Sequence, residues 1–169
     1  NSGTGNIYFT TGSDSVRAQL TGDGLILNGS DTAAANALDD YEEGTATFQL
    51  YINGSEASGV SYSYQTAPYI KIGQLVYCAV SMFATNVPTT TGAVVIQGLP
   101  FTDGGGGGYR ESAFLAGNHG GLSTTTVIIG AIQGNNTKIH LRKNGNQELD
   151  GSDIGSTFWV HGHITYKST

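Results

Sequence analysis

The chain has 169 residues, with 7 Lys and Arg against 13 Asp and Glu, and a formal net charge of −6. That length suits one domain with a core of its own, or such a domain plus a short appendage. A negative charge opposes the phosphate attraction behind nucleic-acid binding, and no apolar run approaches the roughly 18 residues of a membrane span. We therefore expect neither a nucleic-acid partner nor membrane insertion.

The first 30 residues alternate short β-prone runs with turns rich in Gly, Asp and Ser. The runs cover residues 6–12, 16–20 and 23–29. Three strands this short cannot enclose a core alone. Such units become stable when they stack on repeats or wind together with other copies of the same chain.

Residues 31–44 differ in pattern and predict a short helix. Asp31 or Thr32 stands where a cap is needed, and Gly44 stands where the helix would stop. Leu38 and Tyr41 fall on one stripe of it. A helix of about twelve residues is marginal alone and needs a partner surface.

Beyond residue 44 the apolar residues recur with period two between Gly, Pro, Asn and Asp turns. This pattern predicts an all-β fold, an antiparallel β-sandwich or jelly roll. The expected strands are 45–52, 60–64, 69–72, 75–85, 93–97, 112–115, 125–133, 138–142 and 157–166.

Two of these strands show which face is buried. In the run 75–85 the alternate side chains are largely apolar on both faces. Such a strand is central to the sandwich or covered by another subunit, and it should bury the thiol of Cys78. In the run 157–166 one face is apolar, while the other carries Trp159, His161 and His163 and needs a polar or wet environment.

Three motifs carry a resemblance to a known group of proteins. They read NALDDYEEGT at 36–45, PYIKIGQLV at 68–76 and IQGLPF at 96–101, after a GLIL unit at 24–27. In that order they resemble the C-terminal shaft-end and head region of bacteriophage tail fibres and related virion proteins. Ala46 stands where that group usually has Trp.

The resemblance implies a homotrimer with three parts. Residues 1–30 would be the end of an intertwined β shaft, 31–44 a neck, and 45–169 a β-sandwich head. The incomplete N-terminal core and the doubly apolar strand agree with a neighbouring subunit. The implied protein is a non-enzymatic, extracellular virion component whose head contacts a host glycan or an outer-membrane protein. Two alternatives stay open: a polysaccharide-degrading tailspike fragment, and a fibre or decoration protein whose head only trimerises the shaft.

The run of five glycines at 104–108 is the most unusual local feature. Its backbone favours a mobile surface loop, and it lacks the Lys-Ser/Thr ending of a phosphate loop. The loop is either a plain connector or a recognition loop in which Tyr109 stacks on a sugar and Arg110 binds an anion. The candidate receptor-binding residues, including two from the Gly-rich run 117–121, are Asp103, Gly106, Tyr109, Arg110, Asn118 and His119.

The histidine pair His161 and His163 is a candidate metal site. Alternation puts both imidazoles on one side of a strand, about 7 Å apart. One chain supplies two ligands, and three chains around an axis would supply six, which suits an octahedral transition-metal ion. The resemblance supports this, because some tail-fibre tips use His-x-His motifs in this way. The alternative is a pair of solvent-facing histidines beside Trp159.

The remaining polar clusters give little support to catalysis. Asp39, Asp40, Glu42 and Glu43 are neighbours at the junction, where capping or solvation is expected, whereas a glycosidase needs a carboxyl pair across a cleft. No Gly-x-Ser-x-Gly elbow occurs. Residues 144–153 hold oxygen ligands of the kind calcium prefers but lack the EF-hand register.

Overall fold

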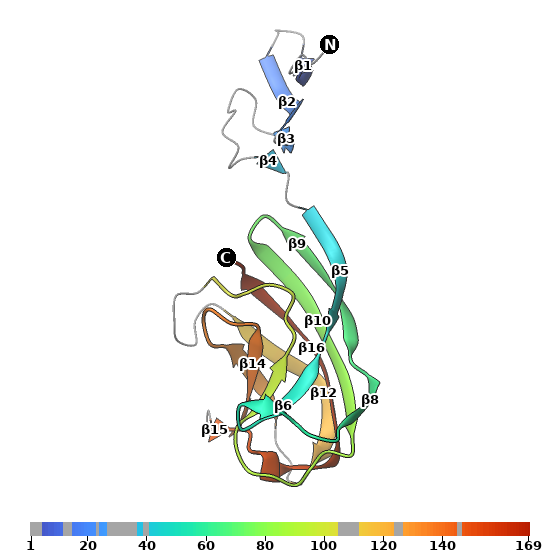
Figure 1. The fold of residues 1–169 in the computed structure, drawn as a ribbon. Coiled ribbons are helices and arrows are strands. Elements are labelled where there is room, and N and C mark those ends of the chain that lie inside the picture. The colour runs from blue at the N-terminus through green and yellow to red at the C-terminus, as the bar shows by residue number, and fades with distance from the viewer. Residues whose placement is uncertain are drawn as a thin grey trace. The chain divides into compact units, whose positions relative to one another are not determined.

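The computed structural model describes residues 5–11, 15–22, 24–26, 37–38, 41–104, 112–123, 127–144 and 147–169. The chain divides into two compact units. The N-terminal unit holds residues 1–42 with 71–73, and the C-terminal unit holds 43–70 with 74–169. Within the described part, strands dominate and no α-helix occurs (Figure 1). The all-β prediction is confirmed.

The N-terminal unit is a four-stranded antiparallel sheet in the order β1-β2-β3-β4. Ile7, Tyr8 and Phe9 of β1 are each more than half exposed, so large side chains face solvent on both sides of that strand. The sheet therefore encloses little core of its own. Winding with other copies stays a prediction. The strands are β1 (Ile7–Thr11), β2 (Ser15–Thr21), β3 (Gly24–Ile26) and β4 (Ala37–Leu38).

The helix predicted within residues 31–44 is wrong wherever the structure describes that stretch. Ala37–Leu38 is strand β4, and Tyr41–Thr47 is strand β5. Leu38 lies opposite Leu25 of β3. Pairing with a neighbouring strand thus replaces a helix too short to be stable alone. The proposed caps Asp31 and Thr32 lie outside the described residues.

The C-terminal unit is one 12-stranded sheet in the order β5-β9-β10-β16-β12-β13-β14-β11-β6-β7, with β8 also pairing with β10 and β15 with β14. A 3-10 helix, η3 (Gly151–Asp153), precedes the last strand. Besides β5, the strands are β6 (Gln49–Ile52), β7 (Ser55–Glu56), β8 (Ser61–Tyr64), β9 (Thr66–Ile72), β10 (Leu75–Thr85), β11 (Val94–Gln97), β12 (Ala113–Leu122), β13 (Ile129–Ile132), β14 (Lys138–Lys143), β15 (Gln147–Glu148) and β16 (Ile154–Lys167).

One bent segment curls this sheet. Strands β5 and β6 follow each other in the chain but lie near opposite ends of the sheet, with Phe48 between them. The Phe48 N–H donates to the Gln65 carbonyl oxygen at 2.7 Å, and the Gln65 side-chain amide donates to the Phe48 carbonyl oxygen at 3.0 Å. The two halves of the sheet therefore face each other across a core, as the ribbon shows (Figure 1).

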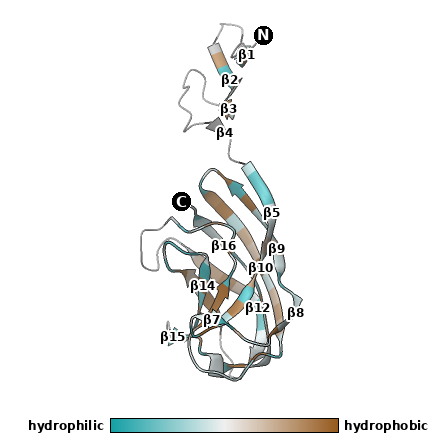
Figure 2. Cartoon of the chain, in the orientation of Figure 1, coloured by the Kyte–Doolittle hydropathy of each residue, from teal (hydrophilic) through white to brown (hydrophobic). Residues whose placement is uncertain are grey.

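The core is centred on the longest strand pair, β10 and β16. They pair antiparallel without interruption from Leu75 opposite Lys167 to Thr85 opposite Thr157. Cys78 is fully buried, as predicted, and burial raises the pKa of its thiol to about 12. Hydrophobic residues are prominent along β10 (Figure 2). The inner side chains, each at most 1% exposed, are Val76, Cys78, Val80, Met82, Ala84, Phe158, Val160, Ile164 and Tyr166.

The three sequence motifs meet at one place in this unit. A Cβ on Gly44 would lie 2.7 Å from the Tyr69 hydroxyl oxygen, so only glycine lets that ring approach β5. The Tyr69 ring meets Phe101 edge to face, with centroids 5.4 Å apart. The Tyr166 hydroxyl donates to the Phe101 carbonyl oxygen at 2.9 Å and accepts from its N–H at 3.2 Å. The motifs therefore hold the fold together.

Tyr166→Phe tests this junction. Burial raises the pKa of the Tyr166 hydroxyl, which keeps it protonated and able to donate. Removing it deletes both hydrogen bonds between the Tyr166 hydroxyl and the Phe101 backbone, so we expect a loss of about 1–3 kcal/mol in the free energy of unfolding. Urea denaturation measures it. Tyr51→Phe keeps the ring that faces the Lys138 ammonium and should unfold like the parent.

His140 gives the stability a pH dependence. It lies on β14 between Val95 and Ala131. Burial lowers the pKa of its imidazole from 6.5; Arg142 and Lys138 lower it further, against the opposing Glu148. The unfolded chain thus takes up the proton first, so the free energy of unfolding should fall as the pH drops below about 6.5.

Thermal melting of His140→Gln at pH 5 to 8 checks this expectation. The variant should lose part of the acid-side slope of the melting temperature. An unchanged slope would show that other groups cause it.

Candidate functional site

The outer face of the C-terminal unit carries a row of aromatic rings, which we call the aromatic row. Register puts Tyr64 of β8 opposite Phe83 of β10, Phe83 opposite Trp159 of β16, and Trp159 opposite Gly120 of β12. The Tyr64 and Phe83 ring centroids are 5.8 Å apart. Phe83 and Trp159 are 5.7 Å apart and nearly parallel, with 17° between their planes. The row crosses four strands.

Gly120 makes room for the indole at the end of the row. A Cβ at Gly120 would lie 2.0 Å from a Trp159 ring carbon, which no side chain permits. Glycine inside a strand often marks such a close approach. Here it lets Trp159 cover the backbone of β12, and Trp159 is the single Trp of the chain.

The two histidines lie beside the aromatic row on the same strand. The Nε2 atom of His161 hydrogen-bonds with the Tyr64 hydroxyl at 2.9 Å, and its Nδ1 with the Ser81 hydroxyl at 3.1 Å. The His163 ring is stacked with Tyr77, with centroids 5.8 Å apart. His161 therefore links β8, β10 and β16 through side chains alone.

The metal hypothesis stays a prediction for this pair. No group of three or more His, Cys, Asp or Glu side chains within the described ranges is placed to hold an ion. Both nitrogens of His161 are engaged within the chain. A metal shared by three copies would have to replace one of these hydrogen bonds.

The glycine-rich loop is fastened at both described ends. The side chain of Asp103 is fully buried, so the prediction that it contacts a receptor is wrong. Its backbone forms an isolated antiparallel β-bridge with Ser168, which anchors the start of the loop. The Gly104 N–H donates to the Lys167 carbonyl oxygen at 2.8 Å, and at the far end the Ser112 hydroxyl accepts from the Ile132 N–H at 3.2 Å. Gly106, Tyr109 and Arg110 lie outside the described residues.

Asn118 and His119 lie in strand β12, beyond the end of the strand predicted at 112–115. Asn118 is exposed opposite His161, while His119 is partly covered opposite Val160. The structure thus brings Asn118 to the outer face beside the histidines. It does not bring His119 there, because the neighbouring position of a strand faces the other way.

The carboxylates named from the sequence do not form a catalytic pair in the described part of the chain. Glu42 and Glu43 are exposed neighbours on β5, so they point to opposite sides of the strand. Asp39 and Asp40 lie outside the described residues. A pair on opposite sides cannot flank one glycosidic bond.

The oxygen-rich run near residue 150 serves local structure. The Asp150 carboxylate accepts from the Ser152 N–H and hydroxyl at 2.9 and 2.7 Å, and these hydrogen bonds lower the pKa of Asp150. The Asp153 carboxylate accepts from the Asp150 N–H and pairs with the Lys143 ammonium at 2.6 Å. The carboxylate oxygens of Asp150 and Asp153, which a calcium ion would need as ligands, are therefore already used to cap η3 and to pair with Lys143.

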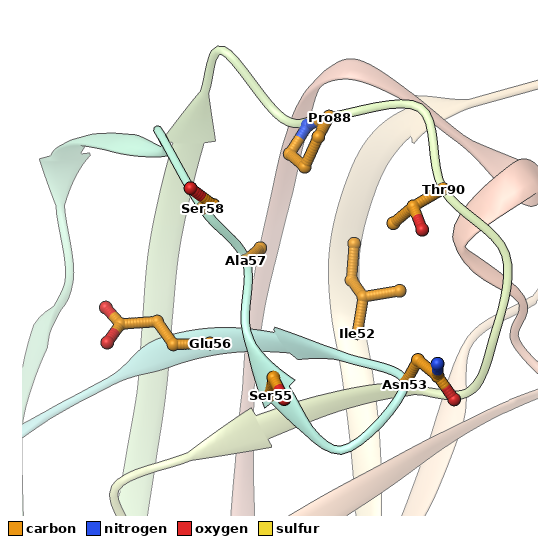
Figure 3. A pocket seen from close by; sticks show the side chains of 8 residues that line it. All are labelled: Ile52, Asn53, Ser55, Glu56, Ala57, Ser58, Pro88 and Thr90. Atoms are coloured by element: carbon orange, nitrogen blue, oxygen red, sulfur yellow. The ribbon is translucent and has the colours of Figure 1, made fainter.

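A shallow hollow lies at the β6–β7 end of the sheet (Figure 3). Its volume is about 320 Å³, and its lining residues are Ile52, Asn53, Ser55, Glu56, Ala57, Ser58, Pro88 and Thr90. Glu56 is the one carboxylate among them. It points away from Ile52 and Thr90 in Figure 3 and accepts from the Gln49 side-chain amide at 2.9 Å. One carboxylate does not provide the pair that glycoside hydrolysis needs.

The comparisons with known proteins point to one fold. No protein-family model matches the chain, and no curated protein matches it. A solved structure that does match is the crystal structure of Dettilon tailspike protein (gp208), with a TM-score of 0.60, 16% sequence identity, and coverage of 76% of this chain and 24% of that one. The chain thus spans about a quarter of that protein, with which it shares a fold. No helix in the described part is long and apolar enough to cross a membrane.

The histidine pair can be tested for metal directly. If three copies hold an ion between them, purified protein should contain about one metal ion per three chains, bound less tightly on acidification because imidazole ligates only when neutral. The melting temperature should then fall with chelator. His161→Gln with His163→Gln should remove both the metal and the chelator effect, measured by elemental analysis and thermal melting. Parent protein prepared without chelator and free of stoichiometric metal would leave the pair as surface residues.

Proposed function

We propose that this chain is the distal part of a bacteriophage tail fibre, a homotrimer whose head attaches to the host surface through a glycan or an outer-membrane protein. The observation that carries the proposal is the fold shared with the Dettilon tailspike protein over 76% of the chain. The three fibre-like motifs, which meet at Gly44, Tyr69 and Phe101, support the same reading.

Receptor contact is assigned to loops, because loops vary while a rigid sheet holds them in place. The glycine-rich loop suits this role, since Gly104 and Ser112 fasten its ends to β16 and β13. Tyr109 would stack on a sugar ring, and Arg110 would bind an anionic group.

Two other functions remain to be separated from attachment. The first alternative is that this chain is a polysaccharide-degrading tailspike fragment, since the structural neighbour is described as a tailspike protein. Incubation of the protein with host polysaccharides distinguishes degradation from attachment, because an enzyme releases reducing sugar and an adhesin does not. A fibre or decoration protein whose head only trimerises the shaft would bind neither a glycan array nor host cells.

Tyr109→Ala with Arg110→Ala tests the attachment loop. The double variant should keep the melting temperature of the parent and lose attachment to host cells, measured with fluorescently labelled protein. Tyr8→Ala with Arg17→Ala changes the same residue types at exposed positions of the N-terminal unit and should attach like the parent. Attachment by the loop variant at the parent's level would make the loop a connector.

A further inference from the structure

Among the described residues of the C-terminal unit, six of the seven exposed large apolar side chains gather on one face, and the seventh, Val127, lies outside the strands. We define the outer face as the side of β8, β9, β10, β16, β12 and β13 that points away from the core. Leu75 and Tyr77 alternate with the buried positions of β10, and Leu115 lies opposite both His163 and Ile129. The exposed members, at 40–57%, are Tyr64, Ile70, Leu75, Tyr77, Leu115 and Ile129.

The same face is almost free of charge. Among the outer positions of β10, β16 and β12, the one charged side chain is Lys167, at the end of β16. The chain as a whole carries a formal charge of −6, so its carboxylates are concentrated elsewhere. Aromatic enrichment with depletion of charge is the composition of an interface core.

We propose that copies of this chain associate through the outer face. The inference rests on the homotrimer of the proposed function and adds the surface and residues that make it. Like-charged copies repel each other, and a face without carboxylates is where they can approach with least repulsion.

The size of the face fits a stable interface. Strands β9, β10, β16, β12 and β13 are consecutive in the sheet and together hold 46 residues. At ~3.3 Å per residue and a strand spacing of ~4.8 Å, their outer side covers about 700 Å². This area is near the roughly 800 Å² that each partner of a standard protein interface buries.

A second copy suits the face better than a host receptor does. Large apolar side chains gathered on one exposed face are uncommon on monomeric proteins and invite aggregation when left open. A receptor met only at the cell surface would leave the face uncovered until then. Another copy is present from synthesis onward and covers it at once.

Cysteine labelling tests the coverage of this face without adding charge. Leu115→Cys should react with a maleimide at least tenfold more slowly than Ser58→Cys, which lies in an exposed turn outside the face. The native Cys78 should not react with the maleimide, because it is buried and its thiol stays protonated. Equal labelling rates would overturn the proposal. So would an Leu115→Cys rate that falls only when host polysaccharide is added, because the face would then be a receptor site.

Charge substitution tests the energetics. The parent should sediment with a mass of about three chains, and Tyr77→Glu with Leu115→Glu should sediment as one chain. Ser55→Glu with Ser58→Glu adds the same charge at exposed positions outside the face and should keep the parent's mass. Emission from the one indole, Trp159, should shift to longer wavelength only in the face variant.

The outcomes separate this inference from the proposed function. A face variant that keeps the three-chain mass overturns the inference and leaves attachment to be judged by cell binding. A parent that associates as expected but binds no host cell overturns the proposed attachment and leaves the inference standing. A monomeric parent overturns both the trimer and its interface. If the variant Tyr77→Glu with Leu115→Glu does not fold, the labelling rates of Leu115→Cys and Ser58→Cys still show whether the outer face is covered.

Discussion

The bend at Phe48 is the constraint on which the C-terminal unit depends. Because β5 and β6 are one continuous segment placed near opposite ends of the sheet, the sheet has to curl. Gln65 holds the bend with two hydrogen bonds, to the N–H and to the carbonyl oxygen of Phe48. Curling then assigns each strand face to the core or to the outside, so the alternate residues of β10 and β16 acquire different roles.

The motifs behind the resemblance belong to this closure. Gly44, Tyr69 and Phe101 come from three separate motifs and pack in sequence, and Gly98 faces Thr47 so closely that a Cβ would lie 2.1 Å from its carbonyl oxygen. Gly98 also has φ of 122°, which favours glycine. Residues that close a fold carry no information on what it binds.

The sequence predicts best where alternation is unbroken. Strand β10 was predicted at Leu75–Thr85 and is observed there, because every second residue is apolar and Gly73 marks its start. Strand β12 extends to Leu122, beyond the predicted 112–115, since its glycines and two bulges break the alternation. Strand β13 is shorter than predicted, at Ile129–Ile132. The aromatic row was not predicted at all, because it requires the register between four strands that are distant in sequence.

The proposed interface also bears on how much a metal at the histidine pair would contribute to assembly. His161 and His163 lie among the apolar residues through which copies are proposed to meet, so an ion there would lie within the interface. Fully burying a large apolar side chain contributes about 1.5–3 kcal/mol, and these side chains begin about half exposed. Six of them together then supply several kcal/mol per copy before the cost of association is subtracted. This gain is comparable with the roughly 4–15 kcal/mol that association costs, so a metal bound by the two histidines would add to the apolar contribution of the proposed interface.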